Sequence, residues 1–289
     1  MDLENTAIER LRMAEQMSLR YYDKPLLVTY SGGKDSDVCL ELARRAGIQY
    51  EVQHSLTTAD APETIRHVKA RFGELELQGV RCTITHPTYK GHRVSMWSLI
   101  PQKLMPPTRA VRYCCQVLKE GAGKNRAITT GVRWAESTKR SKRGVLEAAH
   151  KDISKRVIIT EDNTEDRRLI ERCQLQAKIV CNPIIDWSDR DVWQYLRDIK
   201  CQSNPLYDEG LTRVGCVGCP MAGIRRYTEF RRWPEYEQMY RRAFARMMEA
   251  RQTQGLQTDT WRTAADVWDW WMEDRNLDGQ LSLFGDEEI

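Results

Sequence analysis

One short stretch constrains the fold of this chain more than any other. Apolar residues 26–30 read as a β-strand, a helical pattern begins near Asp37, and six small or polar residues join them: Ser31, Gly32, Gly33, Lys34, Asp35 and Ser36. Glycines between a strand and a helix let backbone N–H groups turn toward an anion, and the positive end of the helix dipole points the same way. The pattern predicts a cradle for a polyphosphate; the alternative is a tight turn without a ligand.

The rest of the chain repeats this alternation of apolar segments and helical patterns. We expect strands at residues 26–30, 48–52, 83–85, 127–130 and 178–181, and helices at 37–46, 62–72, 95–104 and 188–199. Such alternation predicts an α/β fold, a Rossmann-like parallel sheet with helices on both faces, with the ligand at the carboxyl ends of the strands. Beyond residue 219 the pattern is helical. We therefore expect a nucleotide-binding domain at 1–220 and a helical C-terminal extension at 221–289.

Composition narrows the class of protein without naming a partner. The 289 residues carry a net charge of +4, and no stretch approaches the roughly 18 apolar residues of a membrane span. The N-terminus lacks the pattern of a secretory signal, so we expect a cytoplasmic protein that does not associate with membranes. Nine cysteines in such a chain favour metal or redox chemistry over disulfide bonds.

Two parts of the chain are rich in basic residues. Residues 109–143 hold ten Lys or Arg against two acidic residues, which indicates either a solvated face or a wall for an anionic substrate. A second set places arginines beside aromatic residues: Arg225, Arg226, Arg231, Arg232, Arg241, Arg242 and Arg246 with Tyr227, Phe230, Trp233 and Tyr236. This set suits phosphates and unstacked bases, although a solvated helix with an aromatic inner face explains it equally well. The tryptophan stripe at residues 261–272 is interpreted as core-facing rather than as a base-stacking surface.

Four of the nine cysteines form two close pairs, Cys114 with Cys115 and Cys216 with Cys219. Four thiolates in two pairs suit a [4Fe–4S] cube, whose irons are separate corners; a zinc site and four unliganded thiols are the alternatives. Gly215 and Gly218 would let backbone N–H groups turn toward the sulfurs. The remaining cysteines are expected to be ordinary small apolar residues: Cys39, Cys82, Cys173, Cys181 and Cys201.

Several segments occur in an order that resembles one known family. They are SGGKDS at 31–36, TTADAPET at 57–64, RYCC at 112–115 with Lys119, GVR at 131–133 with Glu136, Ser137 and Arg140, NPIIDW at 182–187, and NPLYD at 204–208 leading into GC at 215–216 and CP at 219–220. Over residues 26–234 the chain resembles the phosphoadenosine phosphosulfate reductase family of the adenine nucleotide α-hydrolase-like superfamily. ATP-cleaving members of that superfamily carry a pyrophosphatase loop, or PP-loop, similar to residues 31–36.

The resemblance implies a set of site residues. ATP would bind with Mg²⁺, placing its phosphates on Ser31, Gly32, Gly33, Lys34, Asp35 and Ser36 and its adenosine near Thr57 and Thr58. Catalysis would depend on Lys34, Asp35, Arg133 and Arg140. In iron–sulfur members the paired cysteines and the CxxC bind one [4Fe–4S] cluster, which here implies Cys114, Cys115, Cys216 and Cys219.

Two departures from the reductases decide which activity is expected. No cysteine follows Cys219, whereas the assimilatory reductases carry a nucleophilic cysteine in a C-terminal motif, and their phosphate loop is usually degenerate where this one is intact. The better match is to members that keep both an ATP-cleaving loop and a cluster. Such members include the pyrophosphatase component of bacterial DNA phosphorothioation systems, which this chain resembles, and iron–sulfur tRNA thiolases, which it resembles more distantly.

We therefore expect an enzyme that cleaves ATP to AMP and pyrophosphate and so activates a substrate for sulfur transfer. The expected partners are DNA or tRNA as the sulfur acceptor, a sulfur-donor protein such as a cysteine desulfurase, and a second copy of the chain in a homodimer. Two alternatives stay open. One is a sulfonucleotide reductase that uses an external thiol, and the other is a nucleotide-sensing or partner-binding component without turnover.

Overall fold

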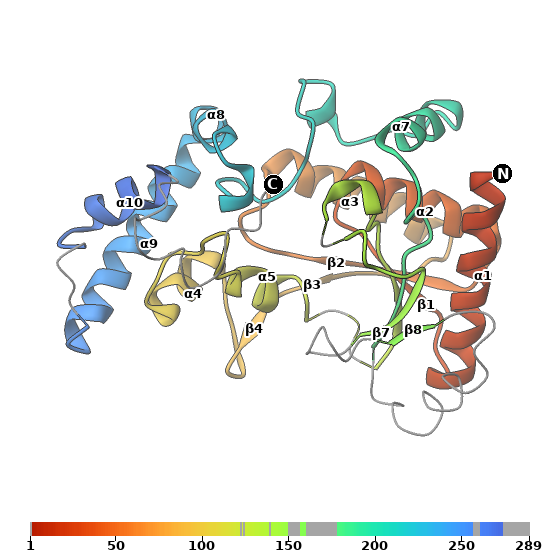
Figure 1. The fold of residues 1–289 in the computed structure, drawn as a ribbon, viewed down its shortest axis with the longest axis horizontal. Coiled ribbons are helices and arrows are strands. Elements are labelled where there is room, and N and C mark those ends of the chain that lie inside the picture. The colour runs from red at the N-terminus through yellow and green to blue at the C-terminus, as the bar shows by residue number, and fades with distance from the viewer. Residues whose placement is uncertain are drawn as a thin grey trace. The chain divides into compact units, whose positions relative to one another are not determined.

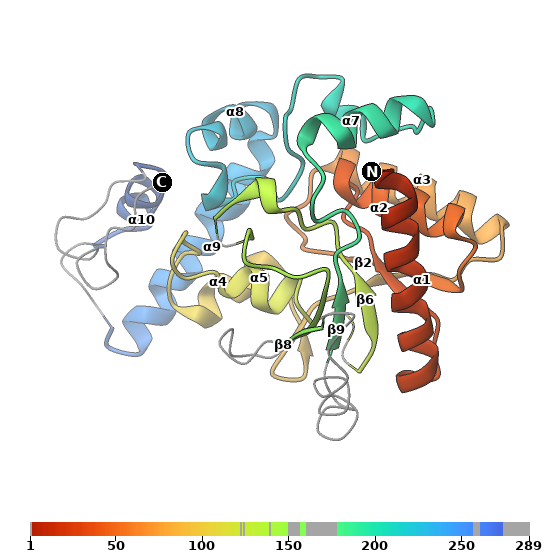
Figure 2. The ribbon, with the colours of Figure 1, turned by 45° about the vertical axis from the view of Figure 1, so that its right-hand side comes forward.

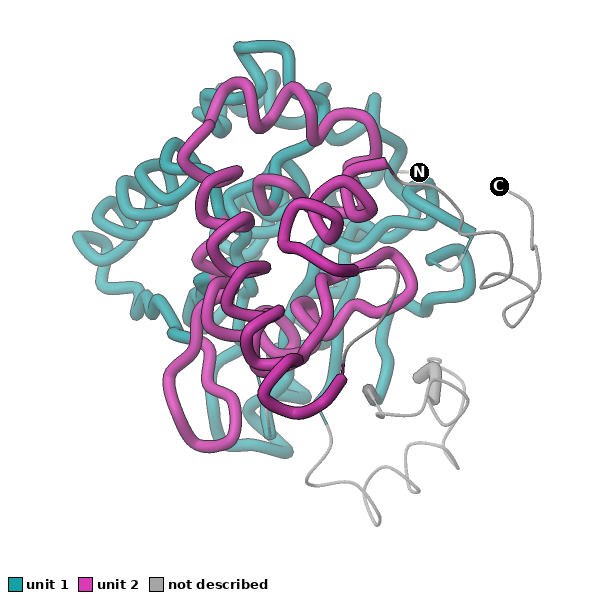
Figure 3. The backbone as a smooth tube through the Cα atoms, turned by 90° about the vertical axis from the view of Figure 1, so that its left-hand side faces the viewer, with its two compact units in different colours: residues 1–56, 60–86, 121–215 teal, residues 57–59, 87–120, 216–289 magenta. Residues whose placement is uncertain are grey.

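The computed structural model describes residues 2–121, 123, 125–138, 140–149, 157–159, 178–256 and 261–273. The chain forms two compact units, each assembled from separate stretches (Figure 3). Unit 1 comprises Met1–Leu56, Asp60–His86 and Gly121–Gly215, and unit 2 comprises Thr57–Ala59, Pro87–Glu120 and Cys216–Ile289. The last division lies near the boundary expected at residue 220, but Pro87–Glu120 belongs with the C-terminal stretch. Cys173, Lys124 and Lys139 lie outside the described residues.

A seven-stranded sheet is the frame of unit 1 (Figure 1). Its strands follow the order β3 (Cys82–Thr85), β2 (Tyr50–Ser55), β1 (Leu26–Thr29), β6 (Ala127–Thr129), β9 (Lys178–Cys181), β7 (Leu146–Ala149) and β8 (Val157–Ile159). The first five are parallel, and the antiparallel β7 and β8, which the sequence did not predict, extend one edge. The predicted α/β class and its five strands are confirmed, with strand ends displaced by up to three residues.

Helices α1 (Leu3–Tyr22), α2 (Lys34–Ala46), α3 (Pro62–Leu77) and α7 (Asp189–Asp198) belong to unit 1. Helix α2 begins three residues earlier than expected, so the second half of the glycine-rich loop is the first turn of the helix. Helix α7 begins as predicted, because the Ser188 hydroxyl accepts from the Asp191 N–H (3.2 Å) and the Asp191 carboxylate accepts from the Ser188 N–H (2.8 Å). The sequence did not predict α1.

Alternation along β1 separates the two faces of the sheet. Leu26 and Val28 belong to the main core, which also contains the buried side chains of α1 and α2. Leu27, between them, lies instead with Ile128 and Val180, because successive side chains of a strand point to opposite faces. A bidentate pair between Arg10 of α1 and Asp186, at 2.8 and 2.9 Å, ties the helix to the segment after β9. The main core therefore lies between the helices and the face of β1 that carries Leu26 and Val28.

Unit 2 is mostly helical (Figure 2). It contains the hairpin β4 (Thr88–Tyr89) and β5 (His92–Arg93), then α4 (Met96–Lys103), α5 (Tyr113–Leu118), α8 (Arg225–Arg232), α9 (Pro234–Thr253) and α10 (Ala264–Glu273). Its core is a cluster of aromatic rings with centroids 4.7 to 6.3 Å apart, formed by Phe230, Tyr240, Phe244, Trp268 and Trp271. Within the tryptophan stripe, Trp268, Trp271 and Met272 thus face the core, as expected, whereas Trp261 is half-buried and Ala265 is exposed. Among the described helices, none has the length and apolar character needed to cross a bilayer.

Candidate functional site

The loop between β1 and α2 is held in shape by its own atoms. Gly32 has φ of +75°, and a Cβ there would lie 2.9 Å from the Val68 side chain, so both conformation and space require glycine. The Gly33 N–H donates to Ser36 Oγ (3.1 Å), and Ser36 Oγ donates to the Gly33 carbonyl (2.7 Å). Ser31 Oγ donates to Ser36 Oγ (3.2 Å). The Ser36 hydroxyl therefore closes the turn, and its predicted part in binding phosphate stays a prediction.

Two residues far along the chain hold the loop from outside. The Asn204 side-chain amide donates to the Gly32 carbonyl (2.9 Å) and to Thr64 Oγ1 (3.1 Å). The Tyr207 hydroxyl accepts from the Lys34 N–H (3.0 Å), and burial raises the pKa of Tyr207 to about 12, so it stays neutral. Both residues lie in the NPLYD segment, for which sequence reasoning predicted no role at the loop. The sequence signal for this role was Asn204 immediately before Pro205 and Tyr207 two residues after it.

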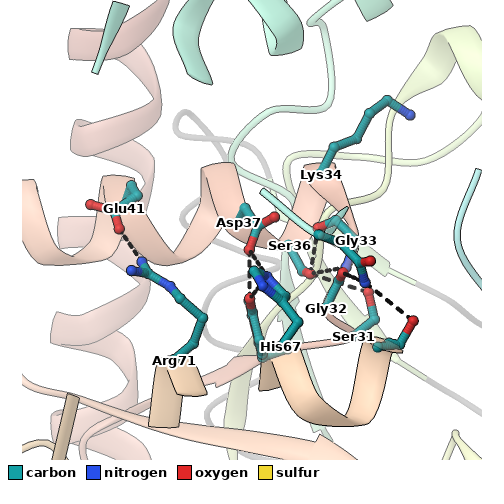
Figure 4. Close-up of polar contacts among 12 residues, drawn as sticks. Ser31, Gly32, Gly33, Lys34, Ser36, Asp37, Glu41, His67 and Arg71 are labelled. Carbon is teal, nitrogen blue, oxygen red and sulfur yellow. Dashed lines mark hydrogen bonds and ion pairs between the residues drawn. The ribbon is translucent and has the colours of Figure 1, made fainter. Parts of the chain in front are cut away.

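A buried polar cluster lies beneath the loop. The Tyr30 hydroxyl donates to Asp37 Oδ1 (2.5 Å), and His67 Nε2 lies 2.9 Å from the same hydroxyl and 3.4 Å from that carboxylate oxygen (Figure 4). Burial, followed by the charge of Asp37, raises the pKa of Tyr30 well above its ordinary value, so the phenol remains a donor. The cluster joins the end of β1, the first turns of α2 and helix α3. Lys34 extends away from it (Figure 4).

Arg133, predicted as a site residue, is brought to the loop by the segment after β6. Its side chain is 2% exposed. Its Nε donates to Asp35 Oδ1 (2.8 Å), its Nη1 to the Trp187 carbonyl (3.3 Å), and its Nη2 to Asp189 Oδ1 (2.5 Å). All three guanidinium nitrogens therefore have acceptors. Burial raises the pKa of Asp35, and the nearby Lys34 and Arg133 charges oppose that rise.

Lys34 joins the same group of charges. Its Nζ lies 3.6 Å from Asp35 Oδ2 and 3.5 Å from Asp189 Oδ1. Asp189 is the first residue of α7, and no sequence motif assigned it to the site. Partial burial would raise the pKa of Asp189, but the hydrogen bond from Arg133 and the charge of Lys34 lower it overall. Two cations and two carboxylates thus lie together at the start of α2.

Arg140 is linked to this group of charges through Glu136. Its guanidinium pairs with the Glu136 carboxylate, and the same carboxylate accepts from the Arg133 N–H (3.0 Å). Arg140 therefore contacts the group through Glu136, and its predicted catalytic role stays a prediction.

Thr57 and Thr58, predicted near adenosine, belong to unit 2. The Thr58 hydroxyl accepts from the Met96 N–H at the start of α4 (2.8 Å) and donates to the Thr57 carbonyl (2.6 Å). Thr57 Oγ1 accepts from the Cys216 thiol (3.4 Å). Their part in adenosine binding stays a prediction, and the contact with Cys216 places Thr57 beside a cysteine.

The four paired cysteines, which the sequence separates widely, line a single pocket within unit 2. The pocket holds about 350 Å³, part of it open to solvent, and its remaining lining residues are Thr57, Met96, Pro107, Leu118, Lys119, Pro220 and Tyr240. Arg112 Nη2 donates to Cys115 Sγ (3.3 Å). A hydrogen bond from Cys114, together with Arg112 and Lys119, lowers the pKa of Cys115. The structure thus groups the predicted cysteines around one cationic and apolar space.

The turn that carries Cys216 and Cys219 depends on Gly218. Its φ is +72°, and a Cβ there would lie 2.4 Å from the Phe230 ring. Its N–H donates to Glu229 Oε2 (2.8 Å), so the expectation that this N–H turns toward a sulfur is wrong. In the described part of the chain, no three His, Cys, Asp or Glu side chains converge as a site for a single metal ion.

Comparisons with known proteins give consistent relatives. Residues 25–222 match the phosphoadenosine phosphosulfate reductase domain family. A protein of uncharacterized function from Methanocaldococcus jannaschii is 25% identical over 233 residues, and the chain spans 42% of that protein's length. A second from the same organism is 29% identical, with 48% of its length spanned. The chain thus spans less than half the length of these two relatives.

Several matches bear functional names, among them one reductase sequence and one reductase structure. The adenosine 5'-phosphosulfate reductase of Allochromatium vinosum is 26% identical over 228 residues, covering 76% of this chain and 75% of the reductase. The crystal structure of phosphoadenylyl-sulfate reductase from Candida auris aligns with a TM-score of 0.45 and 16% identity, covering 73% of this chain and 88% of that one.

The close approach of Gly131 to the loop gives a test of this geometry. A Cβ on Gly131 would lie 2.9 Å from Asp35 Cβ and 3.0 Å from its backbone carbonyl, and backbone cannot give way as a flexible side chain can. Overpacking of this kind costs about 1–3 kcal/mol, so we expect Gly131→Ala to lower the free energy of unfolding by that amount in denaturant titrations. Gly121→Ala, where nothing lies within 4 Å, is the control, and equal stability of the two variants would contradict the contact.

Proposed function

This chain belongs to the phosphoadenosine phosphosulfate reductase family, and we propose that it is an iron–sulfur member that cleaves ATP to AMP and pyrophosphate to activate a substrate for sulfur transfer. The membership confirms the resemblance read from the sequence. The observation that carries the proposal is the intact SGGKDS loop. Lys34 and Asp35 lie in the first turn of the helix that follows it, and the buried Arg133 pairs with Asp35. Chemistry, acceptor and cofactors are proposals for this chain.

Cleavage between the α- and β-phosphates leaves pyrophosphate as the departing group. Negative charge builds on that group in the transition state, and donors fixed beforehand lower the barrier more than flexible ones. Lys34, with a side chain 8% exposed, and Arg133 are such donors because their neighbours hold them. Helix α2 adds the positive end of its dipole. The loop would therefore bind the leaving pyrophosphate, and Arg140 would act through Glu136.

Mg²⁺ bound with ATP would supply charge neutralisation at the β- and γ-phosphates. Oxygen ligands are the kind that Mg²⁺ prefers, and Asp35 offers a carboxylate at the start of α2. Its Oδ1 accepts from Arg133, while Oδ2 is 3.6 Å from Lys34 Nζ. Both oxygens thus already face cations, so contact with Mg²⁺ would require Asp35 to exchange one of these partners; we assign Asp35 to a metal-bound nucleotide from its place in the loop.

A cluster is the proposed occupant of the cysteine pocket, and a zinc ion is the alternative. A structural zinc ion takes four ligand atoms at about 2.0–2.3 Å from one point. A [4Fe–4S] cube instead takes one thiolate at each of four corners, and four cysteines line this pocket. Arg112 and Lys119 would offset the negative charge of the thiolates. Cys114, Cys115, Cys216 and Cys219 are the proposed ligands; the cluster would supply sulfur or redox chemistry when bound.

A sulfonucleotide reductase is the second candidate, favoured by the relative from Allochromatium vinosum named adenosine 5'-phosphosulfate reductase. Residues 220–289 contain no cysteine, so for this candidate an external thiol is the proposed nucleophile. Incubation with adenosine 5'-phosphosulfate and a thiol distinguishes the two candidates, because the reductase releases sulfite and the ATP-cleaving enzyme does not.

A nucleic acid is the proposed sulfur acceptor, and the structure narrows the residues that would bind it. Helix α8 exposes Tyr227 and several arginines, namely Arg225, Arg231 and Arg232. By contrast, Arg226 is buried and donates to the Trp271 carbonyl (2.8 Å), and Phe230, Trp233 and Tyr236 are buried as well. Of the two interpretations of this set, the aromatic inner face therefore applies to these four residues, and contact with a nucleic acid stays a proposal for the exposed ones. In residues 109–143, Arg126 and Arg143 pair with Glu51 and Glu147, which reduces the positive charge available to the proposed wall for an anionic substrate.

Substitutions in the loop test ATP cleavage. Asp35→Ala would also remove a partner of the buried Arg133 and so cost stability, whereas Asp35→Asn keeps an acceptor and removes the charge. We expect Asp35→Asn and Ser36→Ala each to lower the rate of AMP and pyrophosphate formation by about 10²–10³-fold, the usual effect of losing one fixed donor or its support. Chromatographic product analysis measures this. Asp198→Asn, at the far end of α7, is the control, and unchanged turnover in both loop variants would place the phosphate site elsewhere.

The cluster is tested by composition. Protein purified without oxygen should be brown, with about four irons per chain. Cys216→Ser or Cys219→Ser should abolish the colour and lower the melting temperature, because metal binding contributes to folding free energy. Cys82→Ser, in strand β3 of unit 1, should keep both properties. Stoichiometric zinc without iron would exclude the cluster.

Nucleic-acid binding is tested by its dependence on salt. If several phosphates are neutralised, the logarithm of affinity should fall linearly with the logarithm of salt, by about 0.7 to 0.9 per phosphate contact. The double variant Arg231→Ala, Arg232→Ala should flatten this slope in fluorescence anisotropy with DNA and with tRNA. Arg44→Ala, an exposed arginine in α2 of unit 1, is the control. Lack of binding to either polymer at low salt would redirect the search to a small-molecule or protein acceptor.

A further inference from the structure

The cations at the start of α2 are held in place, but one of their anionic partners is not. The Lys34 and Arg133 side chains are 8% and 2% exposed. Asp189, which touches both, has a side chain that is 67% exposed. Its Oδ1 accepts from Arg133 Nη2 (2.5 Å) and lies 3.5 Å from Lys34 Nζ. One exposed carboxylate therefore occupies the space between two fixed cations.

We propose that Asp189 is an internal competitor for phosphate, whose carboxylate holds the position between Lys34 and Arg133 that a phosphate oxygen takes when nucleotide binds. The inference rests on the proposed function, because it assigns the loop to a polyphosphate. Carboxylate and phosphate oxygens accept from a guanidinium in the same way. Rotation of the Asp189 side chain into solvent would release both cations without moving the backbone of α7.

The fold of α7 does not depend on this carboxylate. Acidic residues often stabilise the first turn of a helix, but α7 already has the reciprocal bonds between Ser188 and Asp191. The start of α7 therefore does not require the contact of Asp189 with Arg133. Asp35, the other carboxylate of the group, is less exposed, at 23%. It would remain paired with Arg133 after the Asp189 side chain turns into solvent.

Competition of this kind selects among phosphate ligands. An anion must replace the bonds that Asp189 makes before it gains any net binding. Inorganic phosphate has only the two cations with which to do so, whereas pyrophosphate carries a second phosphate group that the positive end of the α2 dipole also attracts. Asp189 would therefore favour polyphosphates over single phosphates, a property useful to an enzyme whose leaving group is pyrophosphate.

Calorimetric titration of the full chain without Mg²⁺ tests the proposal, with ATP, inorganic pyrophosphate and inorganic phosphate as separate probes. We expect Asp189→Asn to bind pyrophosphate about tenfold more tightly than the unmodified chain, which corresponds to about 1.4 kcal/mol, and to show a smaller preference for pyrophosphate over phosphate. Asp189→Ser should behave alike. Asp198→Asn removes the same charge about 14 Å along the helix and should change neither value, and thermal unfolding checks that each variant is folded.

The outcomes separate this inference from the proposed function. If the unmodified chain binds ATP and pyrophosphate but the Asp189 variants bind pyrophosphate equally or more weakly, the competitor role is excluded and the proposed function stands. If neither the unmodified chain nor the variants bind ATP or pyrophosphate, the loop is not a phosphate site and both ideas fall. An equal gain in Asp198→Asn would assign the effect to net charge and also overturn the inference.

Discussion

The buried guanidinium of Arg133 is the interaction on which the rest of unit 1 depends. It joins the segment after β6 to Asp35 at the start of α2 and to the Trp187 carbonyl before α7. Arginine stays protonated in proteins, so a side chain that is 2% exposed must keep at least one carboxylate partner, and Asp35 is the less exposed of its two partners. The loop between β1 and α2 is therefore positioned by the ion pair of Asp35 with Arg133.

The loop shows how a surface segment becomes rigid. Ser36 closes its turn, and Asn204 and Tyr207 form hydrogen bonds with its backbone. The hydrogen bond between Tyr30 and Asp37 links the residues on either side of it. Each contact uses a polar group that burial would otherwise leave unsatisfied. Donors fixed in this way need no reorganisation when charge develops on a bound group. The rigidity therefore serves the proposed chemistry as well as the fold.

Unit 2 builds its pocket by a different means. Aromatic side chains fill its core, and the Phe230 and Tyr240 rings pack against the turn at Gly218 so closely that no side chain fits there. The Tyr240 hydroxyl donates to the Val217 carbonyl (3.1 Å), which fixes the same turn. Burial raises the pKa of Tyr240 well above its ordinary value, so this donor is permanent. The position of Cys216 and Cys219 thus follows from ring packing rather than from the cysteines.

The sequence by itself determined the features that arise from neighbouring residues: the strand, glycine loop and helix at residues 26–46, the five parallel strands, and the cap at Ser188. Such features depend on local periodicity and backbone freedom, which any stretch of sequence carries within itself. Only the tertiary structure decided that Tyr207 meets Lys34 across 173 residues, that Asp189 lies between two cations, and that Arg226 is buried rather than exposed. These contacts depend on how distant segments pack, and an isolated Asp, Tyr or Arg carries no periodic signal of its eventual partner.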